Sequence, residues 1–335
     1  MARVRTWLQI LALVAALRYS SIQVEAQLMV GFYRTRNCLY AETIVRQTVT
    51  AAINDDPSVA ASLIRMLFHD CFVEGCDASI LLDASPQNPM PEKDAVPNVS
   101  IRGFEVIDAA KAALEKTCPS TVSCADIIAL AARDAVELSG GQSFNMPTGR
   151  LDGTVSSADS AASSLPSPLS STIELTQMFL EQGLSQDEMI TLSGAHTIGS
   201  TTCKQIMSRI YGFDGTRTGV DPYIDFDYAL YLRRLCPENG NTSRSVPLDS
   251  VSPNKFDNMY YMNGITGRVL FPSDTTLFED GQTQFASKLN SQNEDLWEVK
   301  FANAMVHMAS IKVKTARPDQ RGEVRLNCRV TNAGK

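Results

Sequence analysis

Arg65 and His69 are the first residues whose types and spacing could do chemistry. They lie four positions apart in the stretch RMLFHDCFVEGCDAS, so on a helix their side chains share one face. An arginine and a histidine on an otherwise apolar helix are costly to bury unless they have a task. Three interpretations stay open from these letters alone: a zinc site through His69 and Cys71, a disulfide between Cys71 and Cys76, or an acid/base site.

The chain contains only three histidines, which makes the surroundings of each one informative. His196, in LSGAHTIG, is expected to end a second helix, where its small glycine and serine neighbours would leave room for a large planar group. Asp274, in FPSDTTLF, could pair with a buried imidazole. His307 is expected on the surface or boundary of an amphipathic C-terminal helix. The spacing therefore favours His69 and His196 as catalytic or ligand residues.

Elements that could position these residues follow from the apolar periodicity, which is helical. Repeats at three and four residues predict helices over 57–72, 103–118, 123–140, 171–183, 185–199 and 296–311. No alternating run is long enough for a sizeable sheet. Segments 83–98 and 148–171 are rich in Pro, Ser and Gly and are expected to be loops within one fold. The predicted fold class is mainly α.

Charge and cysteine content restrict the class of protein further. Residues 1–26 carry basic residues, an apolar run too short for the roughly 20 residues of a membrane span, and small residues before Gln27, as a removed signal peptide does. Removal takes away three basic residues and one acidic residue, so the formal charge changes from −7 to −9. An acidic exported protein is not expected to bind nucleic acid or membrane. The eight cysteines should form four disulfides, with 105 possible connectivities.

Nine motifs, in order and over nearly the whole chain beyond residue 26, resemble the secretory plant peroxidases, the class III haem peroxidases. They are RMLFHDCFVEGCDAS, EKDAVPN, RGFEVID, VSCADIIALAARDAV, GRLDG, LSGAHTIG, KFDNMYY, SDTTLF and VRLNCRVTN. The resemblance implies a haem peroxidase domain over 27–335, with ten or more helices. A distal half (about 27–165) and a proximal half (about 166–310) would sandwich one haem b, with the C-terminal segment tied back by Cys328.

The resemblance also implies a role for each candidate in the reduction of hydrogen peroxide. His196 would bind the haem iron, and Asp274 would accept its other ring proton. His69 would be the distal base, Arg65 would stabilise developing charge, and Asn98 would hold His69 neutral. Phe68 would wall the haem edge, and Pro166 would orient small phenolic donors. The alternative is a catalytically weak, calcium-bound wall protein of the same fold.

Two calcium ions and one disulfide connectivity are implied in the same way. The first calcium site comprises Asp70, Val73, Gly75, Asp77 and Ser79, with Glu92 acting through water. The second comprises Thr197, Asp249, Ser252, Lys255 and Asp257. The implied disulfides are Cys38 with Cys118, Cys71 with Cys76, Cys124 with Cys328, and Cys203 with Cys236.

Departures from the family pattern concern a few positions. One residue separates Asn98 from Ser100 where two are common, and Leu151 and Glu74 replace a usual Arg and Asn. The shortening creates an Asn-Val-Ser sequon, yet Asn98 is expected to stay unmodified, and Asn241 is the better glycosylation candidate. Gln27 is a candidate N-terminal pyroglutamate. The short segment after Cys328 favours secretion to the cell wall, and a monomer is the default expectation for the oligomeric state.

Overall fold

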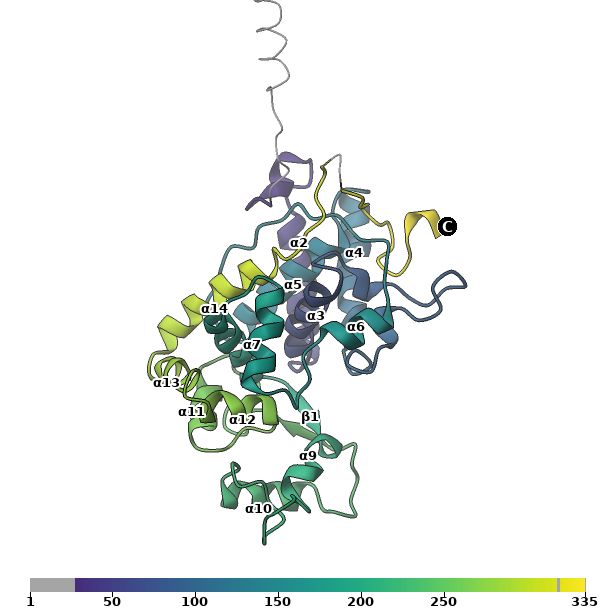
Figure 1. Ribbon diagram of the computed structural model, residues 1–335. Coiled ribbons are helices and arrows are strands. Elements are labelled where there is room, and N and C mark those ends of the chain that lie inside the picture. The colour runs from purple at the N-terminus through teal and green to yellow at the C-terminus, as the bar shows by residue number, and fades with distance from the viewer. Residues whose placement is uncertain (1–27, 318–319, 335) are drawn as a thin grey trace, which may run out of the picture.

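The structure is a computed structural model, and it describes residues 28–317 and 320–334. Over these ranges it contains thirteen α-helices, five short 3-10 helices and one two-stranded sheet (Figure 1). The prediction of a mainly α fold with little β structure is therefore confirmed. The predicted signal peptide and Gln27 lie outside the described residues.

The helices are distributed over the whole described chain. In order they are α2 (Ala41–Asp55), α3 (Val59–Val73), α4 (Phe104–Thr117), α5 (Cys124–Leu138), α6 (Ala158–Ser164), α7 (Thr172–Glu181), α8 (Gln186–Ser193), α9 (Cys203–Ile210), α10 (Phe226–Leu235), α11 (Met259–Ile265), α12 (Pro272–Glu279), α13 (Gln284–Gln292) and α14 (Glu294–Met308). The 3-10 helices are η1 (Phe32–Thr35), η2 (Ser79–Leu81), η3 (Glu92–Asp94), η4 (Gly194–Thr197) and η5 (Asn332–Gly334).

Local capping explains where several of these helices begin. Ser171 and Glu174 form a full capping box at the start of α7, and Ser185 and Glu188 form one at the start of α8. Ser123 accepts a hydrogen bond from the backbone N–H of Asp126 at the start of α5. Pro272 occupies the first turn of α12, where a missing N–H costs nothing. The two capping boxes fix the helices that precede the His196 segment.

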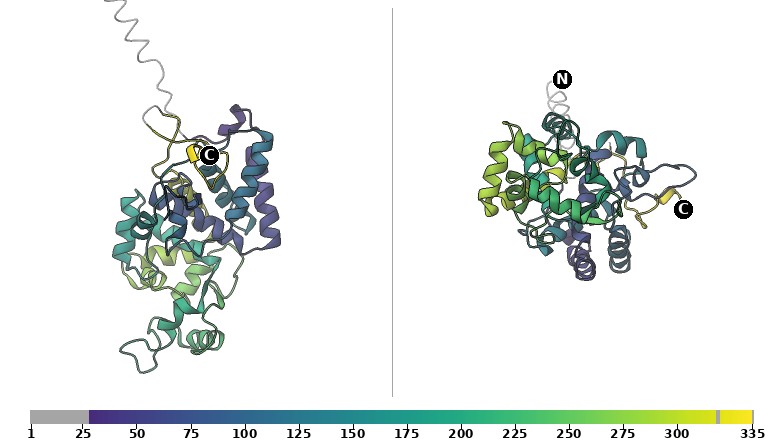
Figure 2. Two further views of the ribbon diagram at one scale, coloured as in Figure 1. Left: turned by 90° about the vertical axis from the view of Figure 1, so that its right-hand side faces the viewer. Right: turned by 90° about the horizontal axis from the view of Figure 1, so that it is seen from below.

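The main hydrophobic core is built around α5, which is buried over almost its entire length. Helix α3 packs against α5, and α2 and α4 pack on its other sides (Figure 2). Buried residues of α7, α8, α11 and α14 belong to the same cluster. Because α3 carries Arg65 and His69, these two residues are anchored in the main hydrophobic core.

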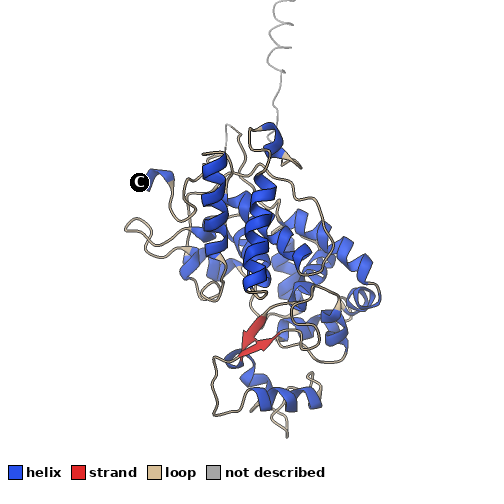
Figure 3. Cartoon of the chain, turned by 180° about the vertical axis from the view of Figure 1, so that it is seen from behind, coloured by secondary structure: helices blue, strands red, loops and turns tan. Residues whose placement is uncertain are grey.

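A second, smaller hydrophobic cluster belongs to α9 and α10, which form a lobe at the lower end of the molecule in Figure 1. The only described sheet lies where this lobe meets the main body (Figure 3). Strands β1 (Ser200–Thr202) and β2 (Ser245–Pro247) pair antiparallel, with Thr201 opposite Val246. Since β1 begins three residues after Thr197, the sheet fixes the chain that leaves His196.

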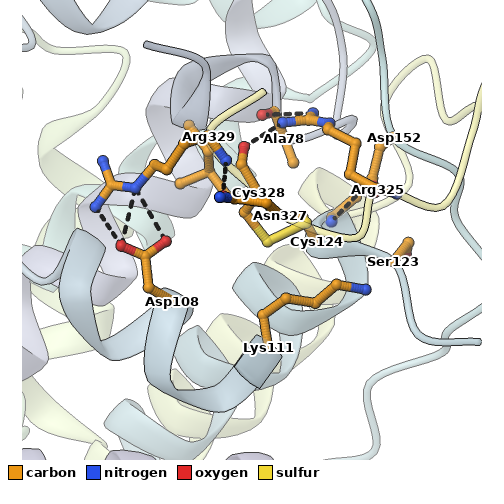
Figure 4. Close-up of a disulfide and its surroundings, with 12 residues drawn as sticks. Ala78, Asp108, Lys111, Ser123, Cys124, Asp152, Arg325, Asn327, Cys328 and Arg329 are labelled. Carbon is orange, nitrogen blue, oxygen red and sulfur yellow. Dashed lines mark hydrogen bonds and ion pairs between the residues drawn. A yellow bond between two sulfur atoms is a disulfide. The ribbon is translucent and has the colours of Figure 1, made fainter. Parts of the chain in front are cut away.

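The four disulfides have the connectivity that the family resemblance implies. Cys38 bonds to Cys118, Cys71 to Cys76, Cys124 to Cys328, and Cys203 to Cys236. The third spans 204 residues and attaches the C-terminal segment to the start of α5 (Figure 4). No described cysteine is free, so zinc binding through Cys71 is excluded.

The C-terminal segment is also held by arginines on either side of Cys328 (Figure 4). The guanidinium of Arg325 is fully buried and donates to the backbone carbonyls of Asp77 (3.1 Å) and Ala78 (2.8 Å). The guanidinium of Arg329 forms a bidentate ion pair with Asp108 on α4. The end of the chain therefore supports the loop that follows α3.

The structure corrects two sequence expectations about elements. Segment 148–171 is not wholly loop, because it contains α6, and segment 83–98 contains η3. The helix predicted over 185–199 ends at Ser193, and His196 lies on the separate 3-10 turn η4. Among the described helices none is long and apolar enough to cross a membrane.

Candidate active site

Helix α3 presents Arg65 and His69 on one face, as their four-residue spacing predicts. The Nε–H of Arg65 donates to Nε2 of His69 at 3.1 Å. The same guanidinium donates to the backbone carbonyl of Pro97 (2.7 Å) and to the hydroxyl of Ser100 (3.0 Å). Arg65 is therefore fixed between the histidine and the loop that contains Asn98.

Asn98 determines which ring nitrogen of His69 carries hydrogen. Its Nδ2 donates to the carbonyl of Glu92 at 2.7 Å, so its Oδ1 must be the atom that faces His69. That Oδ1 accepts from Nδ1–H of His69 at 2.6 Å. The ring therefore keeps the lone pair of Nε2 available, directed toward Arg65. The shortened segment after Asn98 leaves this hydrogen bond intact.

His69 is buried and has a strongly perturbed basicity. Burial and the neighbouring positive charge of Arg65 lower the pKa of His69 to about 3, against a smaller opposing effect of the Asn98 hydrogen bond. The imidazole is consequently neutral at ordinary pH. A neutral imidazole with an unprotonated Nε2 can accept a proton from a bound molecule.

His196 forms the second half of the candidate site, on η4. Its Nδ1–H donates to Oδ1 of Asp274, in the first turn of α12, at 2.7 Å. Burial opposes the protonated form of His196, but the charge of Asp274 and this hydrogen bond outweigh it and raise the pKa of His196. An imidazole held in this way presents Nε2 as a ligand atom and is made more electron-rich by the carboxylate.

Gly194 explains how η4 reaches its place. A Cβ atom at this residue would lie 2.7 Å from the ring of Trp297 and 2.8 Å from the hydroxyl oxygen of Tyr261. The space beside Gly194 is thus filled by protein, and the expectation that this glycine leaves room for a planar group is wrong. Its role is to let the turn that carries His196 pack closely against α11 and α14.

The two histidines differ in their partners. His69 is hydrogen-bonded to Arg65 and Asn98, whereas His196 is hydrogen-bonded to Asp274. His196 keeps 40% of its side chain exposed while its partner Asp274 keeps 5%, so the open side of the ring faces away from the carboxylate. The candidate residues thus comprise an arginine and a neutral base on α3, and a carboxylate-bound imidazole on η4.

Aromatic rings form one wall beside this site. Phe68 is partly buried, and its ring centroid lies 5.2 Å from His69 and 4.5 Å from Phe72. Phe179 of α7 stacks on Phe68 at 6.2 Å. Pro166 is partly exposed in the loop between α6 and α7. That loop is tied to the start of α12, because the backbone N–H of Ser273 donates to the carbonyl of Pro168.

The loop after α3 gathers the first group of calcium candidates. Asp70 accepts from the backbone N–H groups of Ala78 and Ile80, and Asp77 accepts from that of Ser79. Gly75 has φ +92°, and a Cβ there would lie 2.7 Å from Lys312, so only glycine fits. Together with Val73 at the end of α3, these residues form a tight loop closed by Cys71 and Cys76.

The electrostatics of this loop fit a bound cation. Burial and the charge of Asp77 raise the pKa of Asp70 to about 8, and burial and the charge of Asp70 raise the pKa of Glu92 to about 9. Within the described residues, the hydroxyl of Ser79 and both carboxylate oxygens of Glu92 are buried without a hydrogen-bond partner. Buried carboxylates crowded in this way favour a compensating positive charge.

The second group of calcium candidates also converges. Thr197 donates to Oδ1 of Asp257 at 3.0 Å, and Ser252 donates to Oδ2 of Asp249 at 2.8 Å. Lys255 is exposed, and its ammonium lies 3.3 Å from Asp257. Within the described ranges, no three acidic, histidine or cysteine side chains form a metal site by themselves. Both groups instead combine carboxylates with hydroxyl oxygens, which are ligands that calcium accepts.

Sequence reasoning missed one partner of Asp274 and one partner of the first group of calcium candidates. Tyr260 of α11 is buried and donates to Oδ1 of Asp274 at 3.0 Å. Lys314 contacts the carboxylate of Asp77, and its ammonium lies 3.4 Å from the carbonyl of Glu74. The motif KFDNMYY contains Tyr260, but its letters do not say which of the two tyrosines faces Asp274.

The two sequons differ in accessibility. The side chain of Asn98 is 1% exposed and both ends of its amide are hydrogen-bonded, which leaves no room for a glycan. Asn241 lies in an exposed loop. Glycosylation at Asn241 stays a prediction. The division into halves near residue 165 also stays a prediction.

Comparisons with known proteins agree with this geometry. A family model described as peroxidase matches residues 45–293. Peroxidase 5 of Vitis vinifera is 47% identical over 98% of both chains. Peroxidase 25 of Arabidopsis thaliana is 44% identical over 92% of this chain and 93% of its own length, and Peroxidase 1 of Zea mays is 46% identical over 92% and 84%.

A helical fold with four disulfides, matched over most of its length by this family model, defines the class: the chain belongs to the peroxidase family. Its similarity to plant peroxidases over nearly the full chain places it among the class III plant haem peroxidases.

Proposed function

We propose that this peroxidase reduces hydrogen peroxide between His69 and His196 and oxidises small phenolic donors one electron at a time. The observation that carries the proposal is the unlike partner set of the two rings. Asn98 and Arg65 keep His69 neutral with an unprotonated Nε2, whereas Asp274 holds Nδ1 of His196. One imidazole suits proton transfer, and the other suits metal ligation.

The family binds haem and calcium in general, and the residues here fit both. His196 would hold the haem iron through Nε2, with Asp274 as the partner of Nδ1. Haem iron, when bound, supplies the centre that cleaves the O–O bond and stores the oxidising equivalents. The hydrogen bond to Asp274 would make His196 a more electron-donating ligand to the iron of a bound haem.

His69 would move one proton during peroxide reduction. Its Nε2 takes the proton from one peroxide oxygen and returns it to the other, which then leaves as water. The low pKa of about 3 keeps Nε2 ready to accept, and the hydrogen bond from Nδ1–H to Asn98 supports the ring when it is briefly protonated.

Arg65 would stabilise negative charge that develops on the departing oxygen. Its guanidinium already reaches Nε2 of His69, so it lies beside the position where that oxygen forms. The anchors at Pro97 and Ser100 hold this charge in place before the reaction, which avoids a reorganisation cost.

Donor oxidation would take place at the rim near Phe68 and Pro166. Phe68 is fixed by Phe72 and Phe179 and limits access to the distal side. The calcium candidates would brace the two histidines, since Asp70 follows His69 and Thr197 follows His196. Secretion to the cell wall, a monomeric state and two calcium ions are part of the same proposal, and four disulfides fit an oxidising compartment.

The alternative is a catalytically weak wall protein. It is not favoured, because Arg65, His69, His196 and Asp274 are all in contact with the partners that the reaction requires. The relatives with 44–47% identity are also named peroxidases.

The proposal is tested by adding haem and calcium to the purified protein and recording its absorption spectrum and guaiacol oxidation. A Soret band that depends on His196 and turnover that depends on His69 are expected. His307→Ala serves as the matched control, because His307 is exposed on α14 and bonds Glu188. Absence of a Soret band from the wild type, or an unchanged one from His196→Ala, would overturn the proposal. A Soret band without turnover would favour the wall-protein alternative.

A further inference from the structure

Asp274 receives two hydrogen bonds on the same oxygen atom. Its Oδ1 accepts from Nδ1–H of His196 at 2.7 Å and from the hydroxyl of Tyr260 at 3.0 Å. Tyr260 is 2% exposed and lies on α11, whereas Asp274 lies on α12 and His196 lies on η4. Its ring stands edge-on to that of His196, with centroids 6.1 Å apart. A buried phenol and the candidate iron ligand therefore share one acceptor.

We propose that Tyr260 is a positioning residue that weakens the pull of Asp274 on His196 and so sets the reduction potential of the bound iron. This inference rests on the proposed function of His196 as the iron ligand. It assigns the hydroxyl of Tyr260 a task beyond filling the core.

The physical reason is competition for the charge on Oδ1. A hydrogen bond to a charged carboxylate is stronger than one between neutral groups, and each donor on the same oxygen reduces the negative charge available to the other. Without the phenol, Oδ1 draws the Nδ1 proton of His196 more strongly, and the imidazole becomes more anionic. A more anionic ligand stabilises the oxidised iron and lowers the potential.

The surroundings keep Tyr260 in the donor role. Burial and the charge of Asp274 raise the pKa of Tyr260 well above its usual range, so the phenol stays protonated. The ring is held by edge contacts with Tyr261 and by Phe278 of α12. Asp274 itself stands in the first turn of α12, where the helix favours a negative charge. The phenol thus acts on a carboxylate whose position is already fixed.

The neighbouring residue provides a matched control. Tyr261 is also fully buried, and its hydroxyl donates to the carbonyls of Ile190 (2.8 Å) and Thr191 (3.1 Å) instead of to Asp274. Tyr261→Phe removes a buried hydroxyl from the same helix without changing the partners of Oδ1. A purely structural role of the tyrosines predicts similar behaviour of the two variants.

The experiment compares wild type, Tyr260→Phe and Tyr261→Phe, each loaded with haem and calcium. The readouts are the ferric/ferrous midpoint potential by spectroelectrochemistry and the iron–histidine stretching band of the ferrous protein by resonance Raman. Tyr260→Phe should shift the reduction equilibrium toward the ferric form about three- to tenfold, up to about 59 mV for one electron, and raise the frequency of the band. Tyr261→Phe should leave both near the wild-type values.

A second variant covers the case in which Tyr260→Phe does not fold. Site-specific 3-fluorotyrosine at position 260 keeps the ring and strengthens the donor, so the potential should shift in the opposite direction. The inference would be overturned if the variant at position 260 that folds keeps the wild-type midpoint potential. It would also be overturned if Tyr260→Phe and Tyr261→Phe shift the potential equally. His196→Ala distinguishes the two levels: if it retains the iron–histidine band, the proposed function itself fails.

Discussion

Replacing Asn98 by leucine removes the hydrogen bonds that orient His69 while keeping the side-chain volume. Asn98 is 1% exposed, and the change deletes its bonds to Nδ1–H of His69 and to the carbonyl of Glu92. Nδ1–H of His69 is then left without a partner, whereas the carbonyl of Glu92 keeps the hydrogen bond from the backbone N–H of Ala95. Because a buried group left unpaired costs about 1–3 kcal/mol, we expect the free energy of unfolding to fall by roughly 1–3 kcal/mol.

The kinetic effect follows from the His69 bond alone. If its loss costs the reaction about 1.4–2.7 kcal/mol, the rate constant with peroxide falls roughly 10- to 100-fold. His69→Ala removes the base itself and should slow the reaction by about two to four orders of magnitude. Asn98→Leu should thus lie between wild type and His69→Ala in stopped-flow measurements on the haem-loaded protein.

Asn88→Leu is the control for loop destabilisation. Asn88 lies in the same loop and donates its Nδ2–H to the carbonyl of Ser156 at 2.8 Å, without contact to His69. This variant should lose stability and keep the wild-type rate constant. If Asn98→Leu folds and reacts with peroxide as fast as wild type, the reasoning that Asn98 holds His69 in its reactive tautomer is wrong.

Three further outcomes follow from the site and the fold. Because the pKa of His69 is lowered to about 3, its Nε2 stays unprotonated as the pH falls from 8 to about 4. The rate constant with peroxide should stay constant between these pH values and decline below about pH 4. A decline that begins near pH 6 would contradict the low pKa. Calcium removal by EDTA should lower the melting temperature measured by circular dichroism by at least about 2 °C, because Asp70 and Glu92 lose their compensating charge. An unchanged melting temperature would argue against the calcium sites. Replacing Cys124 and Cys328 by serine should lower the free energy of unfolding, measured with denaturant, by about 2–5 kcal/mol. Removing the Cys203–Cys236 disulfide, which closes a shorter loop, should lower it by about 1–2 kcal/mol less. A larger loss for the shorter loop would contradict the chain-entropy reasoning.

Contacts that are local in sequence could be predicted from the sequence. Arg65 and His69 follow from a four-residue spacing on a strongly apolar helix, and the structure brings them together as expected. The pairing of His196 with Asp274, 78 residues apart, was only a possibility from spacing, and it took the family resemblance to choose it. Periodicity gives a face of a helix, but it does not tell which distant element packs on that face.

Short polar elements were the ones that sequence reasoning missed. The sequence of α6 predicts a loop, because its serines compete with helical hydrogen bonds and the segment has no apolar stripe. Gly194 was misjudged for a related reason. A glycine marks a close approach, but only the structure tells whether the approaching group is a ligand or, as here, Trp297 and Tyr261.

Arg325 imposes an order on the folding of the distal loop during synthesis. It is separated by 248 residues from Asp77, whose carbonyl it binds. The loop after His69 is therefore synthesised long before its donor. A nascent chain that stops before residue 325 would hold all of α3 and yet an incomplete distal loop. The distal loop can be completed only after the segment that carries Arg325 has been made.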